Sequence, residues 1–278
     1  MQKIVMITGC SSGIGHELAV QLNQRGWKVY ATARKAENLE TLREAGCRTM
    51  QLDVTIPRQV EETVDKIIAE CGHLDMLINN AGYGLIAPAV EIPADELFRQ
   101  FQTNFFGVMD LTRKVTGVMK TQKEGKIINI GSISGIAPTP FSAAYCASKA
   151  AIHAASDVLR MELKPFGIRV ITVQPGGIST DFGRNCEKTV GRILQPDSLY
   201  APIEKFVYHR ANTSQEKATP VSEFVHKLIP RIVQHDPPSV IRIGKRSHTL
   251  PLMKRLLPEK ILDRMMMKKY GLNLLRME

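Results

Sequence analysis

A tyrosine and a lysine lie four residues apart in the stretch YCASK, as Tyr145 and Lys149. Positions i and i+4 of a helix share a face, so a helix here would hold the ammonium group beside the phenol oxygen. A free phenol has a pKa near 10, too high for proton transfer at neutral pH, and a nearby cation lowers that pKa by favouring phenolate. An isolated pair at this spacing would be a chance surface feature, but with suitable neighbours it predicts an acid/base group.

A serine precedes the tyrosine in the stretch NIGSISG, where Ser132 follows an apolar run. A serine at the carboxyl end of a parallel strand lies at the ligand-binding edge of the sheet. There Ser132 can hydrogen-bond a substrate carbonyl oxygen beside Tyr145. Ser134 is the alternative, although it lies beyond the strand end.

The positions of these residues depend on alternating strands and helices. Amphipathic periodicity predicts helices at 13–25, 57–71, 95–121, 143–165 and 221–235. Apolar runs rich in β-branched residues predict strands at 3–7, 27–33, 48–52, 74–79, 126–131, 168–174 and 240–243. Near-continuous apolar strands are typical of a parallel sheet covered on both faces. We therefore predict an α/β protein with a single-domain Rossmann fold over 1–247, a doubly wound parallel sheet of about seven strands.

Two segments depart from this alternation. Residues 176–220 are long and polar and are predicted to be irregular, with a substrate lid at about 181–220 after the sixth strand. Residues 248–278 are predicted to form a basic C-terminal extension packed on the domain or at an interface. The apolar lid residues either line a pocket or pack the lid on the body, and we expect packing for at least half of Phe182, Leu194, Leu199, Tyr200, Phe206 and Val207.

A glycine-rich turn, TGCSSGIG, follows the first predicted strand and opens a helix. Gly9, Gly13 and Gly15 let the backbone turn tightly and approach a pyrophosphate, and the helix N-terminus offers free N–H groups. Ser11 and Ser12 can add hydroxyl donors. This context of strand, turn and helix predicts a dinucleotide site.

The second predicted strand ends at Arg34, where dinucleotide folds place the adenosine ribose. A carboxylate there would bind the ribose 2′-hydroxyl, whereas an arginine suits a 2′-phosphate. Arg34 therefore predicts NADP(H) in preference to NAD(H), with a solvated surface charge as the alternative.

Charge and cysteine content limit the other functions. The net charge of the 278-residue chain is +10, and residues 242–276 hold ten Lys/Arg against two acidic residues. Nucleic acid, an anionic membrane surface or a solvated face would each explain this excess. No nucleic-acid motif is present and only 6% of residues are aromatic, so we expect no nucleic-acid partner. The basic tail is expected either to contact a membrane peripherally or, as we prefer, to pack on the body.

The cellular location is predicted from the absence of disulfide, membrane-spanning and signal-peptide patterns in the sequence. Five scattered cysteines form neither a disulfide framework nor a metal-binding spacing, so reduced thiols and no metal are expected. No run of 18 apolar residues exists and no signal peptide fits the N-terminus. We predict a cytoplasmic protein, peripheral to a membrane at most.

Together these motifs resemble the short-chain dehydrogenase/reductase family over about residues 3–245. The family pattern TGxxxGxG matches the glycine turn, NNAG matches 79–82, and YxxxK matches Tyr145 and Lys149. The resemblance implies that Tyr145 is the acid/base, that Lys149 lowers its pKa and holds the nicotinamide ribose, and that Ser132 polarises the carbonyl. By resemblance alone, Asn104 holds a water that connects Lys149 to solvent, although helix packing is its ordinary role. Further cofactor contacts are implied for Ser11, Ser12, Ile14, Asp53, Val54, Asn80, Ala81, Gly82, Pro175, Gly176 and Thr180.

The stretches VYATAR and LKPFGIRV are similar to the branch that contains 17β-hydroxysteroid dehydrogenases, retinol dehydrogenases and acyl-dihydroxyacetone-phosphate reductases. This resemblance implies an NADP(H)-dependent oxidoreductase acting on a lipophilic alcohol or ketone. It also implies a homodimer or homotetramer formed through the helices of 95–121 and 143–165. The alternative is a cofactor-binding regulatory or scaffold protein with little catalysis, against which the complete set of motif residues argues.

Overall fold

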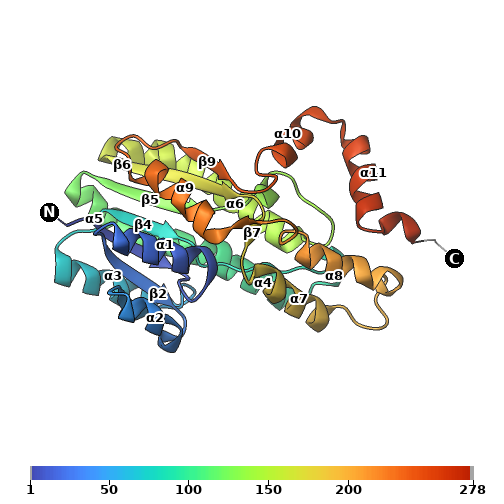
Figure 1. Cartoon of the computed structure of the whole chain (residues 1–278), viewed down its shortest axis with the longest axis horizontal. Helices are drawn as coiled ribbons and strands as arrows, with labels where there is room; N and C mark the ends of the chain where they lie inside the picture. Colours follow the sequence, from blue (N-terminus) through green and yellow to red (C-terminus); the bar gives the residue numbers. More distant parts are fainter. Residues whose placement is uncertain (1, 276–278) are drawn as a thin grey trace.

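Seven parallel strands form the centre of the molecule in the computed structural model, which describes residues 2–275 (Figure 1). Their order across the sheet is β3-β2-β1-β4-β5-β6-β9, which reverses direction between β1 and β4 and so is doubly wound. All seven strands were predicted, and the α/β fold is confirmed. The strands span Ile4–Thr8, Lys28–Ala33, Arg48–Gln51, Met76–Asn79, Gly125–Ile130, Ile168–Pro175 and Val240–Ile243, for β1 to β6 and β9.

Helices bury both faces of this sheet. On one face, α1 (Gly13–Gln24), α2 (Glu40–Glu44) and α9 (Val221–Val233) pack their apolar sides against the strands. On the other face, α3 (Pro57–Cys71) and α5 (Gly107–Gln122) enclose a second apolar core. The end of α6 (Ala143–Leu163) adds to that core, so α6 runs from the second core toward the carboxyl edge of the sheet.

The predicted helix 95–121 is interrupted. It consists of α4 (Ala94–Phe101), a π-turn at Gln102–Phe106 and then α5. A π-turn adds one residue to a helical turn, so it changes which side chains face inward, and such turns are common at functional sites. Shorter 3₁₀ turns lie at Ala36–Leu39, Ala89–Glu91, Ile133–Gly135, Lys164–Phe166, Ala201–Ile203 and Leu272–Leu274.

The prediction that 176–220 is irregular was wrong. This segment contains α7 (Phe182–Ile193) and α8 (Glu204–Asn212), framed by the short parallel strands β7 (Ile178–Ser179) and β8 (Thr219–Pro220). Each helix has one narrow apolar stripe in an otherwise polar sequence, which is why composition alone suggested a loop. The two stripes pack on each other in a separate small core, whose buried members include Cys186, Val190, Val207 and Ala211.

The C-terminal residues form two more helices, α10 (Thr249–Leu256) and α11 (Glu259–Lys269), which extend from the sheet toward α8 (Figure 1). Tyr270 is buried in the same small core as α7 and α8, and Met266 packs against it. The division between a domain over 1–247 and an extension over 248–278 stays a prediction. Within residues 2–275 no helix has both the length and the apolar character needed to cross a bilayer.

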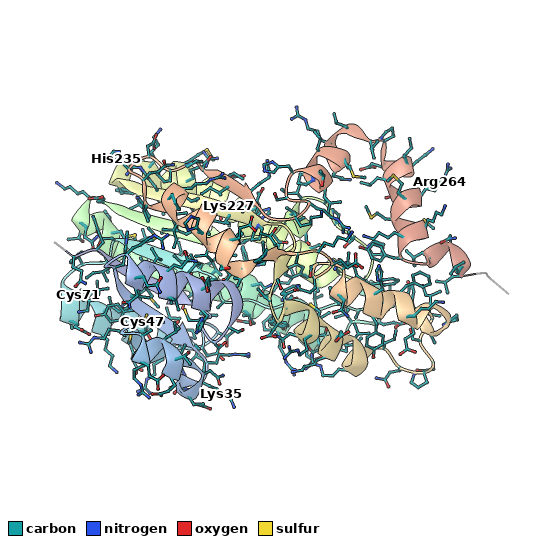
Figure 2. The ribbon with its side chains drawn as sticks, viewed as in Figure 1. Lys35, Cys47, Cys71, Lys227, His235 and Arg264 are labelled. Carbon is teal, nitrogen blue, oxygen red and sulfur yellow. The ribbon has the colours of Figure 1, made fainter. Side chains whose placement is uncertain are left out.

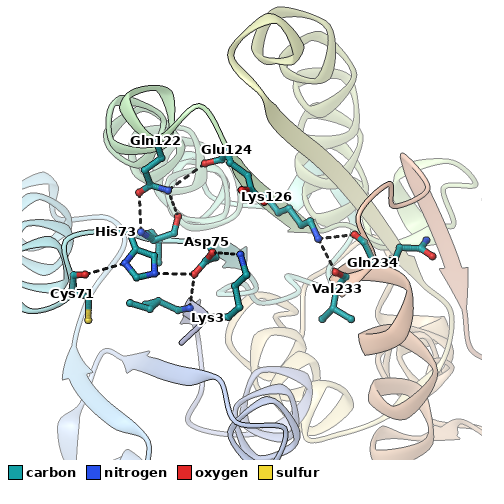
Figure 3. A network of polar contacts seen from close by, with 11 residues as sticks. Lys3, Cys71, His73, Asp75, Gln122, Glu124, Lys126, Val233 and Gln234 are labelled. Carbon is teal, nitrogen blue, oxygen red and sulfur yellow. Dashed lines mark hydrogen bonds and ion pairs between the residues drawn. The ribbon is translucent and has the colours of Figure 1, made fainter. Parts of the chain in front are cut away.

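Polar contacts stabilise the amino edge of the sheet (Figure 3). The Asp75 carboxylate accepts hydrogen bonds from Lys3 Nζ and the Ile4 backbone N–H, both at 2.7 Å. The Lys126 ammonium donates to the carbonyls of Val233 (2.9 Å) and Gln234 (2.7 Å), where a cation suits the C-terminus of α9. These bonds occupy the amino edge, whereas the residues predicted to do chemistry lie at the carboxyl edge.

Candidate active site

A cavity of about 1440 Å³ lies at the carboxyl edge of the sheet. Ligand sites for single small molecules occupy about 300–1,000 Å³, so this volume suits a dinucleotide together with a substrate. Of the predicted site residues, only Gly15 and Asn104 are missing from the cavity wall. The wall contains Gly9, Ser11, Ser12, Gly13, Ile14, Arg34, Asp53, Val54, Asn80, Ala81, Gly82, Ser132, Tyr145, Lys149, Pro175, Gly176 and Thr180.

The glycine turn between β1 and α1 leaves no space for side chains. Gly9 has φ +72°, and a Cβ added there would lie 2.8 Å from the Ala81 Cα. A Cβ on Gly15 would lie 2.4 Å from the Gly9 carbonyl oxygen, which explains why Gly15 is required although it lies behind the cavity wall. The Gly13 backbone approaches Thr180, whose Cγ2 would lie 3.3 Å from an added Cβ. This cradle of bare backbone at a helix N-terminus fits the pyrophosphate of a dinucleotide.

The NNAG segment joins the central strands. Asn80 donates from its side-chain amide to the carbonyls of Thr8 (2.9 Å) and Gly9 (3.0 Å), so it shapes the glycine turn. Asn79 donates to the Asn129 side chain on β5 at 2.9 Å, inside the sheet. Through these contacts the NNAG segment connects neighbouring strands of the sheet.

The adenosine end of the cavity lies beyond β2. Arg34 is exposed there and lines the cavity, and it forms no ion pair within the described part of the chain. Asp53 is held in place because its carboxylate accepts from the N–H (2.9 Å) and hydroxyl (2.7 Å) of Thr55. The geometry leaves the guanidinium available to a ligand phosphate.

In the same cavity wall, the three residues first singled out lie just after β5 and on α6. Ser132 follows β5 and accepts a hydrogen bond from the Ser134 N–H at 3.1 Å, so Ser134 supports Ser132 at the strand end. Tyr145 lies in the first turn of α6 with its ring centroid 5.3 Å from that of Phe182. Lys149 lies one turn further along and donates from Nζ to the Ile130 carbonyl at 2.8 Å.

Burial has the largest effect on the pKa of Tyr145, and the lowering of this pKa by Lys149 stays a prediction. Burial raises the pKa of Tyr145 far above its ordinary value, against opposing contributions from the Ser132 hydrogen bond and the charge of Arg210. Lys149 is itself buried, and the loss of solvation lowers its pKa to about 8. For Tyr145, desolvation therefore outweighs the Ser132 hydrogen bond and the charge of Arg210, and this favours the protonated phenol.

Asn104 is buried in the π-turn, behind the cavity wall. Its amide nitrogen donates to the Tyr83 carbonyl (3.0 Å) and to Ser148 Oγ (3.1 Å), and its oxygen accepts from the Tyr83 N–H (3.1 Å). A Cβ on Gly82 would lie 3.0 Å from Asn104 Oδ1 and 3.6 Å from Lys149 Nζ, so both side chains border Gly82. The contacts show a packing role, and the water-holding role stays a prediction.

Sequence reasoning missed two residues of this region. His153, one turn beyond Lys149 on α6, accepts a hydrogen bond from the Ser132 N–H at 3.3 Å. Arg210 on α8 lines the cavity close enough for its charge to act on Tyr145. Tyr145, Lys149 and His153 are spaced by four residues, so the sequence could have predicted that His153 shares their helix face. No local pattern predicts that Arg210 lies in the cavity wall.

The apolar residues of α7, α8 and the segment between them mostly pack. Of the six proposed earlier, only Phe182 lies in the cavity wall. Leu194, Tyr200, Phe206 and Val207 belong to the small core, and Leu199 is 73% exposed. The expectation that packing accounts for at least half of them is confirmed.

Comparison with known proteins defines the family. The family model described as short chain dehydrogenase matches residues 3–191, which is more than half of the chain. The chain therefore belongs to the short-chain dehydrogenase family, whose members are oxidoreductases.

Individual relatives align with this protein over most of its length. The NADPH-dependent 1-acyldihydroxyacetone phosphate reductase of Schizosaccharomyces pombe is 38% identical over 237 residues, 84% of this chain and 79% of the relative. The 3-ketodihydrosphingosine reductase of Bacteroides thetaiotaomicron is 41% identical over 194 residues, 68% and 70% of the two chains. A serine dehydrogenase structure complexed with NADP⁺ superposes with a TM-score of 0.76 at 27% identity, covering 88% of this chain and 96% of the other.

Proposed function

We propose that this protein is an NADP(H)-dependent oxidoreductase that interconverts an alcohol and a carbonyl on a lipophilic substrate. The observation that carries the proposal is the convergence of Ser132, Tyr145 and Lys149 in the wall of one cavity that the glycine turn also lines. Two relatives are named as reductases, and one of them as NADPH-dependent, which supports the same direction and cofactor.

The residues present fit NADP(H). The bare backbone of the glycine turn would hold the pyrophosphate, and Arg34 would hold the 2′-phosphate through charge-assisted hydrogen bonds. Lys149 would hold the nicotinamide ribose. When bound, the reduced cofactor supplies the hydride that reduces the carbonyl carbon.

The side chains of the site handle the proton. The Ser132 hydroxyl would donate a hydrogen bond to the substrate carbonyl oxygen, which polarises and orients the carbonyl. Tyr145, kept protonated by its raised pKa, would then transfer its proton to that oxygen. The Lys149 ammonium stabilises the phenolate left behind, because their opposite charges interact strongly away from water.

The cavity has apolar side chains in its wall as well as charged ones. Its wall includes Phe98, Phe182, Met253, Met265 and Met266. Such a wall favours a substrate with an alkyl or aromatic body, because burying apolar surface stabilises binding by about 25 cal/mol per Å². A lipophilic ketone or alcohol therefore suits this cavity.

The test is NADPH oxidation by the purified protein with 1-acyldihydroxyacetone phosphate, 3-ketodihydrosphingosine, retinal and steroid ketones. We expect turnover of at least one of these substrates. Tyr145→Phe should lower kcat by about 10² to 10⁴, the usual contribution of a general acid, while NADPH fluorescence titration shows unchanged cofactor binding.

The regulatory or scaffold alternative makes the opposite prediction. If the wild-type protein binds NADPH but oxidises it with none of these substrates, the oxidoreductase proposal loses its support. Equal turnover by wild type and Tyr145→Phe would contradict the assigned role of the tyrosine.

A further inference from the structure

An arginine is buried in the wall of the cavity without an acidic partner. Arg210 on α8 is only 7% exposed, and it takes part in none of the ion pairs formed within residues 2–275. Arginine is almost never buried to this degree unless its charge is paired, because desolvating a guanidinium is costly. An anion from a bound ligand would therefore stabilise the buried guanidinium, because residues 2–275 supply none.

Only one nitrogen of the Arg210 guanidinium forms a hydrogen bond within residues 2–275. Its Nε donates to Thr139 Oγ1 at 2.7 Å, and Thr139 is in turn bonded to Ser142, which caps the start of α6. Neither terminal nitrogen of the guanidinium has a hydrogen-bond partner in the described part of the chain, yet neither is sealed from solvent. Because Arg210 lines the cavity, these two nitrogens open into it.

Through Thr139 and Ser142 the guanidinium is connected to the start of α6, three residues before Tyr145. Its charge lowers the pKa of the Tyr145 phenol and of the Cys186 thiol, opposing the larger effect of burial on each. Glu216, an acidic wall residue on the next segment, lies 3.5 Å from His209 instead. Further positive charge in the wall comes from Lys188, Lys245, Arg246 and Lys269, whereas Arg192 is paired with Glu96 at 3.0 Å.

We propose that Arg210 recognises an acidic group on the substrate, so that the physiological substrate is a lipophilic carbonyl compound with a phosphate or carboxylate near the reacting carbon. A guanidinium presents two parallel donors that match both anions. The proposal rests on the oxidoreductase function above and adds the class of substrate. The anion bound by Arg210 is distinct from the cofactor phosphates, which are assigned to Arg34 and the glycine turn.

A matched pair of substrates tests the proposal. The rate of NADPH oxidation is measured with 1-acyldihydroxyacetone phosphate and with the same acyl-dihydroxyacetone lacking the phosphate. We expect wild type to prefer the phosphorylated ketone in kcat/KM by about 10- to 100-fold, the value of one or two charge-assisted hydrogen bonds. Arg210→Met should remove this preference, because kcat/KM for the phosphorylated ketone should fall by about 10- to 100-fold more than kcat/KM for the neutral ketone does.

Two further variants separate recognition from folding. Arg210→Lys, which keeps the charge but loses the fork, should recover only part of the preference. Arg231→Met, an exposed arginine on α9 outside the cavity, is the matched control and should retain the full preference. Activity on the neutral ketone shows that each variant is folded.

Calorimetric titration with dodecyl phosphate and with dodecanoate adds a measurement that needs no turnover and separates the two anions. Wild type should bind at least one of them at least about tenfold more tightly than Arg210→Met does. Turnover of ketones with no preference for the phosphate and equal binding in both proteins would overturn the inference yet leave the oxidoreductase function intact. If no ketone is turned over, the oxidoreductase function fails separately, and the titration still decides whether Arg210 binds an anion.

Discussion

Coenzyme choice in this fold depends on the side chain at the end of β2, which here is Arg34. Arg34→Ala should weaken NADPH binding by about 10- to 100-fold and leave NADH binding unchanged within about twofold, because only NADPH carries the 2′-phosphate. Fluorescence titration of both cofactors measures this. Lys35→Ala, at an exposed neighbour paired with Glu37, is the control and should change neither affinity. Equal losses for both cofactors in Arg34→Ala would contradict the assignment.

His153 supports Ser132 and makes stability depend on pH. Burial, followed by the charge of Lys149, lowers the pKa of His153 to about 4, while Asp157 raises it and Arg242 lowers it further. Because the unfolded histidine has a pKa near 6.5, the unfolded chain takes up this proton first as the pH falls. The free energy of unfolding should therefore decrease from about pH 6.5 downward, by about 2 kcal/mol between pH 7 and pH 5 from this group alone.

Urea unfolding at pH 7 and pH 5 checks this expectation. His153→Gln, which keeps a hydrogen-bond acceptor for the Ser132 N–H but does not titrate, should lose about 2 kcal/mol less than wild type between the two conditions. His235→Gln, at an exposed histidine beyond α9 (Figure 2), should behave like wild type. The same loss in all three proteins would show that His153 does not carry the effect.

At the scale of elements, the connection from β1 to α1 requires glycine for two separate reasons. Gly9→Ala places a side chain at φ +72° and also 2.8 Å from the Ala81 backbone, whereas Gly26→Ala meets only the strain of φ +82°, with no atom within 4 Å. Both variants should be destabilised by about 1 to 2 kcal/mol from backbone strain. Gly9→Ala alone should lower Tm further and weaken NADPH binding at least about tenfold, because the cradle must shift.

Thermal unfolding and NADPH titration of the two glycine variants separate these effects. Equal Tm values and equal cofactor affinities would mean that close backbone approach at Gly9 has no importance. The same argument explains why Gly15 is required although it lies outside the cavity wall: it allows α1 to pack against the turn.

The helices were predicted well where they cover the sheet and less well elsewhere. The seven strands and the helices flanking them carry long apolar patterns, which depend only on neighbouring residues. The π-turn between α4 and α5 and the helices α7 and α8 depend on contacts between distant segments, such as Cys186 and Val207 with Tyr270. No local pattern records such contacts.

At the scale of the whole molecule, the C-terminal helices present an apolar and basic surface. Leu252, Leu256 and Ile261 are 54%, 67% and 47% exposed on α10 and α11, and these helices also contain basic residues such as Arg264 (Figure 2). Tyr270 meanwhile anchors the end of the tail in the small core. Packing on the body is the preferred prediction for the tail, and the membrane alternative predicts that this surface binds anionic vesicles with an affinity that falls as salt rises.

Co-sedimentation with phosphatidylserine vesicles measures this binding. The double variant Leu252→Ser and Leu256→Ser removes apolar surface without touching Tyr270, and it should bind at least about tenfold more weakly. A Lys227→Ser variant on α9, on another part of the surface (Figure 2), is the control. No sedimentation of the folded wild type would restrict the tail to packing on the body.

Local patterns in the sequence were enough to determine which segments form buried strands and where the glycine turn lies. They also determined the tyrosine–lysine pair on one helix face and the arginine at the end of β2. These features depend on residues near one another in the chain. Only the tertiary structure decided that burial raises the pKa of Tyr145, that Asn104 is bonded to the Tyr83 backbone, and that Arg210 opens into the cavity. Desolvation and charge pairing depend on segments brought together from across the chain, so they become visible only when the chain is folded.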